Sequence, residues 1–171
     1  LCLGRDAATL DLRRTVALPP TMREGWGITH DGAGTLYASD GSSRLHVLSG
    51  PRFELSHTVE VTAAGRPLYY LNDLQWVGGE VWANVWHDER IAVIDPRSGA
   101  VRCFVDLSGL LTPTERRLLG SDEHVLNGLA HDASSGRTFV TGKCWPRLFE
   151  IEVLFDAAAA DGAETAEVQP R

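Results

Sequence analysis

Short apolar and β-branched runs dominate the chain, and Gly, Pro, Asp and Ser separate them. Runs of this kind are typical of strands in an antiparallel β-protein. One segment differs, because Pro113 follows Thr112 and can open the first turn of a short helix, which Gly120 can end. The pattern therefore predicts an all-β fold, with strands that include 35–40, 44–49, 80–86, 90–95, 101–107 and 147–153.

The hydrophobic positions recur along the chain and predict an internal repeat. An offset of 46 residues brings Leu36 onto Trp82, and it relates four successive strands without a gap. A third copy follows the second at an offset of 55 residues that widens to 57, with the two extra residues in the turn 132–136. Four strands in about 40 to 50 residues is the period of a β-propeller blade.

The repeat divides the chain into a partial β-propeller over residues 1–153 and a tail over 154–171. We expect blades at about 24–61, 70–107 and 125–153, and we expect residues 1–20 to be the remnant of a preceding blade. Propellers typically close with about four to eight blades, so the repeat predicts an N-terminally truncated ring. The tail is rich in Ala and acidic residues, and we expect it to be disordered.

Strand ends in the repeat carry residues whose chemistry changes from copy to copy. The first strands of a propeller line its central channel, so residues at the start of these strands converge on one end of that channel. Variable polar and aromatic residues at one place on a repeated scaffold indicate a binding site. The candidates are Trp26, Asn72 and Asn127 at the starts of the first strands, and Asp40, Trp86 and Lys143 at the ends of the second strands.

Composition narrows the possible partners. The chain is 43% apolar and 23% charged, which is ordinary for a globular domain. A net charge of -7 without a basic cluster argues against nucleic acid or an anionic membrane as the partner. The three cysteines have no CxxC spacing, so neither a zinc site nor a disulfide framework is indicated, and no cofactor is expected. No signal peptide is visible, and the compartment stays unknown.

Several motifs in order resemble the plant and bacterial type of glutaminyl-peptide cyclotransferase, also called glutamine cyclotransferase. The resemblance covers residues 1–153 and is specific through the combination of its motifs. It implies a five-bladed β-propeller and a metal-independent transferase, often exported, that cyclises the N-terminal glutamine of peptides or proteins to pyroglutamate and releases ammonia. The motifs are EGWGITHDG (24–32), LNDL (71–74), NVW (84–86), VLNGLAHD (125–132) and TGKCWP (141–146).

The resemblance also implies roles for individual residues. Lys143 and Asn72 match catalytic positions of the family, and Trp26 and Trp86 match substrate-binding positions. Asn127 and Asp40 are possible site residues from the repeat alone. The family's catalytic glutamate is borne by a blade that these 171 residues lack, so we expect the chain alone to have little or no cyclase activity.

Two other functions fit part of the pattern. A calcium-dependent, lactonase-like propeller would use Asn72, Asn127 and Asp40 as oxygen ligands, but Trp86 and Lys143 fit poorly beside a divalent cation. A non-catalytic propeller remnant that binds peptide ends would use the same candidate residues as a binding site and would need no catalytic glutamate.

Overall fold

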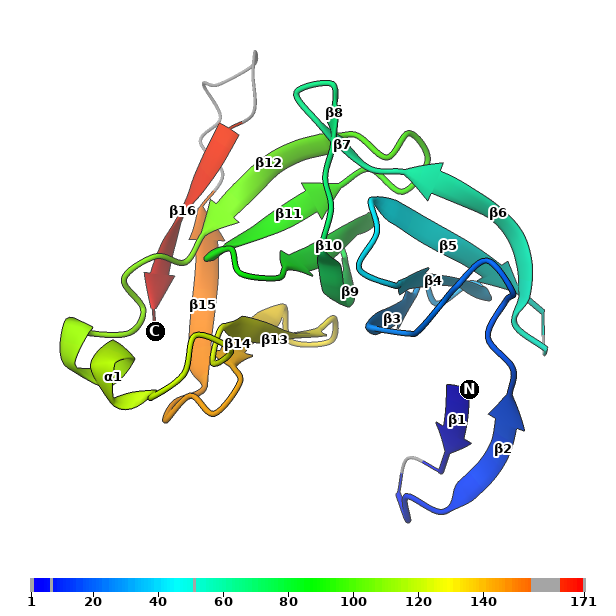
Figure 1. Ribbon diagram of the computed structural model, residues 1–171, viewed down its shortest axis with the longest axis horizontal. Helices are drawn as coiled ribbons and strands as arrows, with labels where there is room; N and C mark the ends of the chain where they lie inside the picture. The colour runs from blue at the N-terminus through cyan, green and yellow to red at the C-terminus, as the bar shows by residue number, and fades with distance from the viewer. Residues whose placement is uncertain (1, 7, 51, 155–163, 171) are drawn as a thin grey trace.

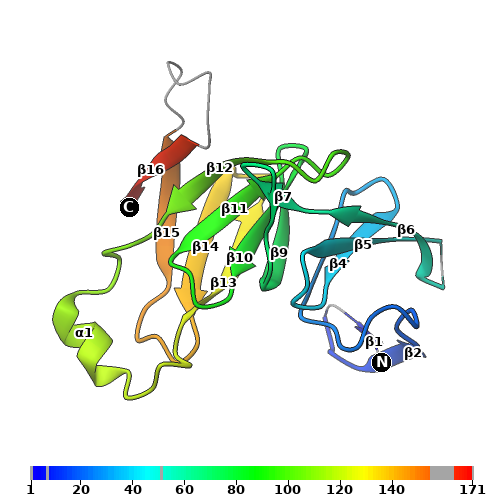
Figure 2. The same cartoon turned by 45° about the horizontal axis from the view of Figure 1, so that its top comes forward.

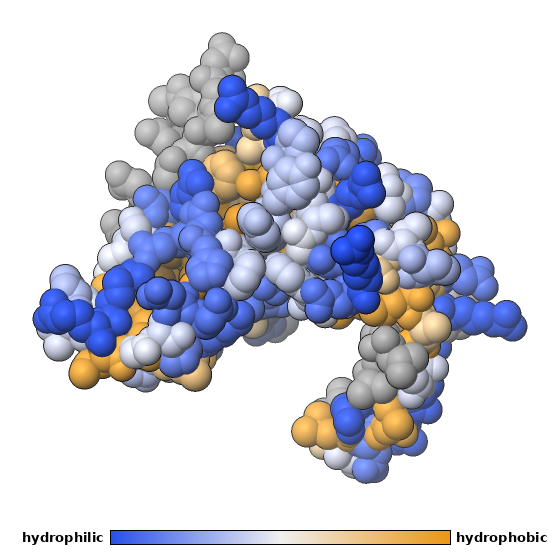
Figure 3. All heavy atoms as spheres, in the orientation of Figure 1, coloured by the Kyte–Doolittle hydropathy of each residue, from blue (hydrophilic) through white to orange (hydrophobic). Residues whose placement is uncertain are grey.

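The computed structural model describes residues 2–6, 8–50, 52–154 and 164–170. Three blades stand side by side in an arc, and a separate hairpin near the N-terminus projects from the body of the arc (Figures 1 and 3). The sheets do not close into a ring. This open, nearly all-β arrangement confirms the predicted fold class of a partial β-propeller.

The first blade is a four-stranded antiparallel sheet. Its strands follow one another in chain order, as in a propeller blade. They are β3 (Gly27–His30), β4 (Thr35–Ser39), β5 (Arg44–Ser49) and β6 (Glu54–Glu60).

The second and third blades form one eight-stranded sheet, because a strand from the C-terminal tail joins their outer edges. The second blade consists of β9 (Leu71–Val77), β10 (Glu80–Val85), β11 (Arg90–Ile94) and β12 (Val101–Asp106). The third blade consists of β13 (Leu126–Asp132), β14 (Arg137–Gly142), β15 (Phe149–Leu154) and the tail strand β16 (Glu164–Pro170).

Strand β16 corrects the expectation that the whole tail is disordered. It pairs antiparallel with β15, and it pairs parallel with β12, where Ala166 lies opposite Val105. The prediction rested on the composition of the tail, whereas the strand forms through backbone pairing with two otherwise open edges. Residues 155–163 and 171 lie outside the described part of the chain.

The remaining elements are short. The hairpin of β1 (Cys2–Arg5) and β2 (Leu12–Val16) lies where the remnant of a preceding blade was expected. A second small hairpin, β7 (Thr62–Ala63) and β8 (Arg66–Pro67), connects the first two blades. Helix α1 (Pro113–Leu118) confirms the predicted helix and stands apart from the sheets (Figure 2). Thr112 caps it in a capping box with Glu115. Among the described residues, no helix is long and apolar enough to cross a membrane.

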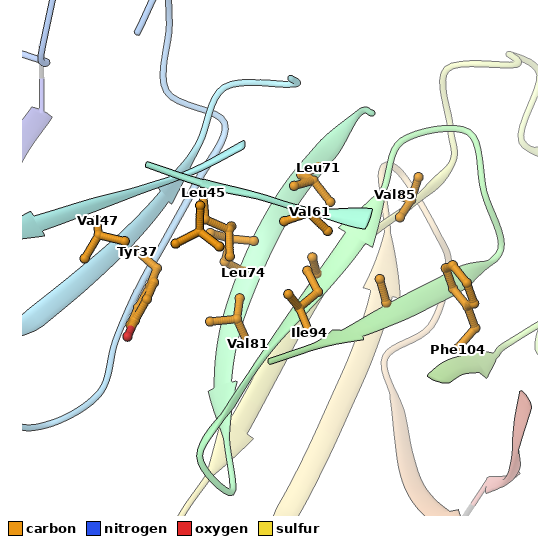
Figure 4. Packing of buried hydrophobic residues seen from close by; sticks show 13 residues of the cluster. Tyr37, Leu45, Val47, Val61, Leu71, Leu74, Val81, Val85, Ile94 and Phe104 are labelled. Carbon is orange, nitrogen blue, oxygen red and sulfur yellow. The ribbon is translucent and has the colours of Figure 1, made fainter. Parts of the chain in front are cut away.

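Two apolar cores hold the blades together. The first core fills the space between the first two blades, where Leu45 and Val47 of β5 face Leu74 and Val81 (Figure 4). The second core joins the second and third blades, and Trp82 packs in it with Val140 and Ile151 among others. Facing sheets that bury apolar side chains in this way fix the angle between blades and so fix where the strand ends meet.

The pairing of strands corrects one detail of the predicted repeat. Tyr37 is opposite Val47, and Trp82 is opposite Val93, so Tyr37 and not Leu36 takes the place of Trp82. The offset that relates the second strands of the first two blades is therefore one residue smaller than the offset that relates their first and third strands. The hairpin loop after β3 is one residue longer than the Gly78–Gly79 loop after β9. The loop between β4 and β5 is in turn one residue shorter than the loop between β10 and β11. Two opposite length differences cancel in an ungapped comparison and cannot be seen in the sequence.

Candidate functional site: an aromatic and ammonium cluster from three blades

Trp86 lies at the centre of the site. Its ring meets the Trp26 ring edge to face, with 5.6 Å between centroids and 83° between planes. The Nζ atom of Lys143 lies over the same ring, 5.8 Å from its centroid, which is within the range of a cation–π contact. Three blades thus contribute one residue each, and the structure brings together three of the six predicted site residues.

Backbone hydrogen bonds place the second and third of these residues in the same way. The N–H of Trp86 donates to the carbonyl of Tyr70 over 2.9 Å, and the N–H of Lys143 donates to the carbonyl of Val125 over 2.9 Å. Each bond ties the turn after a second strand to the entry of the first strand of the same blade. The repeat therefore delivers Trp86 and Lys143 to equivalent places through the backbone, whatever their side chains are.

Gly41 makes room for Trp26. Its backbone has φ of +78°, and a Cβ atom there would lie 2.7 Å from the Trp26 ring. Glycine alone meets both conditions, because it tolerates left-handed backbone and has no side chain. The N–H of Trp26 donates to the carbonyl of Ser39, which fixes the chain at the entry of β3.

Asn72 is buried, with 8% of its surface exposed, and it lies in a β-bulge. Asn72 and Asp73 together oppose the single residue Asn84 between the pairs Leu74 with Ala83 and Leu71 with Val85. A bulge re-aims the side chains that it contains and is common beside active sites. The carbonyl of Asn72 accepts a hydrogen bond of 2.6 Å from Ser39 Oγ, which ties this bulge to the first blade.

Asn127 lies in the matching bulge of the third blade, where Asn127 and Gly128 oppose Thr141. Both bulged segments belong to neighbouring first strands, since β9 packs beside β13. The repeat predicted these two asparagines at equivalent positions, but the bulge itself gave no signal in the sequence.

The structure does not bring the Asp40 carboxylate to the cluster. Asp40 does occupy the same turn position as Trp86 and Lys143, and each of the three precedes a residue with left-handed backbone. Its carboxylate instead bonds inside the first blade, to His46 Nε2 over 3.1 Å and to Ser42 Oγ over 2.6 Å. A carboxylate held in this way does not favour the calcium-ligand role. Across the described ranges, no group of three His, Cys, Asp or Glu side chains is placed to hold a metal ion.

Burial raises the pKa of Asp73, although the N–H groups of Leu129 and Leu74 donate to its carboxylate and oppose the shift. The bond to Leu129 reaches from the second blade to the third. Because both oxygens accept backbone N–H groups, the geometry gives Asp73 a role in joining blades.

Two aromatic residues of the cluster were missed by the sequence analysis. The Tyr70 and His87 rings contact Trp86, with centroids at 5.9 Å and 4.3 Å. Both residues have positive φ, 68° and 64°, which is uncommon for side chains of this size. Tyr70 directly precedes the LNDL motif and His87 directly follows NVW, so position next to a motif was the signal that was available.

Two hollows flank the cluster. One of about 290 Å³ is lined by Trp26, Asp73 and apolar residues of the first blade and of the segment before it, such as Leu48 and Met22. The other, of about 230 Å³, is lined by His87, Val125 and residues of α1 and of the segment that follows it. Neither hollow is lined by Lys143, so we assign the site from the contacts among side chains.

The site and the fold together define an open β-propeller with a cluster of two tryptophans and a lysine at strand ends of three blades. A sequence model of the glutamine cyclotransferase family matches residues 1–153, and the chain belongs to that family.

Individual relatives agree. A glutaminyl-peptide cyclotransferase of Arabidopsis thaliana is 39% identical over 166 residues, which are 94% of this chain and 50% of that protein. The crystal structure of Myxococcus xanthus glutaminyl cyclase superposes with a TM-score of 0.76 at 37% identity, over 83% of this chain and 59% of that one. A virginiamycin B lyase of Staphylococcus aureus, at 15% identity and a TM-score of 0.50, covering 85% of this chain and 40% of its own, shares the fold alone. The chain spans about half the length of the Arabidopsis relative.

Proposed function

We propose that the chain contributes Trp26, Asn72, Trp86 and Lys143 to a pocket that binds the N-terminal glutamine of a peptide or protein and cyclises it to pyroglutamate. In this reaction the α-amine nitrogen bonds to the side-chain amide carbon, and the bond from that carbon to the amide nitrogen breaks. A proton passes from the α-amine to the leaving nitrogen, which departs as ammonia.

The ammonium group of Lys143 would act on both reacting groups. The α-amine must be neutral to attack, and its ordinary pKa of about 7.7 to 8.0 leaves it mostly protonated at neutral pH. A nearby positive charge disfavours that cationic form. As the amine attacks, negative charge develops on the amide oxygen, and donors from Lys143 and the Asn72 carboxamide would stabilise it.

The two tryptophans would shape the pocket. Their edge-to-face contact forms a rigid apolar corner, which suits the short aliphatic stem of glutamine and excludes water from the reacting atoms. The enzyme then needs only to hold the folded-back form of a substrate whose nucleophile is already tethered.

The observation that carries this proposal is the contact of Trp26, Trp86 and Lys143 from three blades in a chain of this family. Lys143 is the only lysine of the chain, so lysine labelled with ¹³C at Cε gives a single NMR signal from the site. We expect a peptide with N-terminal glutamine to shift this signal saturably, while the same peptide with N-terminal alanine leaves it unchanged. An unshifted signal at millimolar peptide would contradict the proposal.

Turnover is measured on the same samples as ammonia released from the glutamine peptide. Whatever rate the chain supports, we expect Lys143→Met to lower it by about 10²- to 10³-fold, because one donor to the developing oxyanion is lost. Arg147→Met is the matched control. It removes a positive charge from the same loop, but Arg147 is paired with Glu115 over 2.7 Å and does not belong to the cluster.

A further inference from the structure

Asn127 carries an unused hydrogen-bond acceptor two residues after Val125, whose carbonyl holds the backbone N–H of Lys143. Its Oδ1 atom is buried and has no hydrogen-bond partner in the described part of the chain. A buried acceptor left unpaired costs about 1 to 3 kcal/mol, so native structures rarely keep one without a reason.

The bulge around Asn127 does not need this oxygen. The N–H groups of Gly128 and Leu129 donate instead to side chains of the second blade. Asn84 Oδ1 accepts from Gly128 over 3.1 Å, and Asp73 Oδ2 accepts from Leu129 over 2.9 Å. The segment is thus held from the neighbouring blade, and the Oδ1 atom of Asn127 is left available.

A matching donor lies on Trp86. Its Nε1 atom is also buried without a hydrogen-bond partner among the described residues. Trp86 belongs to the cluster, and Lys143 is tied to Val125, two residues before Asn127. One unpaired acceptor and one unpaired donor are the complement of a primary carboxamide, which donates through its nitrogen and accepts through its oxygen.

We propose that Asn127 Oδ1 accepts a hydrogen bond from the side-chain amide nitrogen of the substrate glutamine, the nitrogen that leaves as ammonia. This inference rests on the proposed function and adds a specificity-determining residue to it. An N-terminal glutamate would present a carboxylate oxygen without a proton to the same acceptor and would be rejected. A site built to bind an N–H discriminates strongly against analogues that lack it.

The test combines two probes with three forms of the chain. One probe is a short peptide with N-terminal glutamine. The other is the same peptide with the γ-methyl ester of glutamate at its N-terminus, which keeps the side-chain carbonyl and the aliphatic stem but has no N–H on the side chain. Dissociation constants come from the ¹³C signal of Lys143. We expect the unchanged chain to bind the amide at least tenfold more tightly than the ester.

Asn127→Leu should bind both probes with affinities within twofold of each other, because the acceptor is gone. Asn127→Asp keeps an acceptor of the same shape and should keep the preference for the amide. Any general damage to the pocket weakens both probes alike and cancels in the ratio of the two constants. Circular dichroism shows whether each variant is folded. If Asn127→Leu does not fold, the preference measured with Asn127→Asp tests the proposal.

The outcomes separate the two proposals. If the unchanged chain binds neither probe, the proposed function fails. If it binds amide and ester equally, or if the preference survives in Asn127→Leu, or if Asn127→Asp loses it, the pocket stands and the role of Asn127 is overturned.

Discussion

At the scale of single residues, backbone bonds place Trp86 and Lys143 in equivalent turns, whereas side-chain bonds inside the first blade hold the Asp40 carboxylate. Trp86 and Lys143 were predictable because equivalent backbone bonds place both residues. The Asp40 carboxylate was not, because its bonds to His46 and Ser42 depend on rotamers inside one blade. The bulges at Asn72 and Asn127 were also invisible, since a bulge is a difference in pairing between two strands and neither strand shows it alone.

Gly41 gives a test of how the aromatic corner is built. Gly41→Ala adds a Cβ atom that would lie 2.7 Å from the Trp26 ring, at a φ of +78°. We expect about 1 to 2 kcal/mol of destabilisation from the left-handed backbone, and in addition a displaced Trp26 ring. The displacement is measured as a loss of the near-ultraviolet circular dichroism produced by the Trp26 and Trp86 pair.

Gly32→Ala is the matched control for that experiment. Gly32 has nearly the same φ, +75°, and an added Cβ atom meets nothing within 4 Å. It should lose similar stability in denaturant melts and keep the near-ultraviolet signal. Equal spectra for the two variants would mean that the Trp26 ring does not depend on the space above Gly41.

At the scale of elements, the sequence located most strands and the helix, because each carries its own local pattern. Helix α1 follows from Thr112, Pro113 and Glu115 within one turn. Strand β16 has no such local cause. Its pairing depends on β12 and β15, which precede it in the chain and have one open edge each without it.

The tail strand should control association between molecules. Ala166→Pro combined with Val168→Pro removes two backbone donors from β16, and proline is poorly tolerated within paired strands. We expect stability to fall by about 2 kcal/mol, from about 1 kcal/mol for each lost bond. The freed edges of β12 and β15 should also produce larger species, measured by light scattering during size-exclusion chromatography.

Serines at the same two positions provide the control, because they change the side chains and keep both N–H groups. If the proline variant elutes as a single species of unchanged size and stability, β16 does not protect the sheet edges.

At the scale of the whole molecule, the blades are joined in two different ways. The second and third blades share a continuous sheet through β16. The first blade has a sheet of its own and meets the second through the apolar core and a few bonds, such as the one from Trp76 N–H to Thr29 Oγ1. Arrays of repeats whose units contact only their neighbours need not unfold as one unit.

Leu45 tests this difference. It is fully buried in the core between the first two blades, and Leu45→Ala should cost about 2 to 5 kcal/mol. Because the first blade has no sheet in common with the others, we expect amide hydrogen exchange to accelerate in β4 and β5 while β13 and β14 stay protected. Val140→Ala, in the second core, should accelerate exchange in the third blade and spare the first. Uniform acceleration in both variants would show that the arc unfolds as a single cooperative unit, and the site would then depend equally on all three blades.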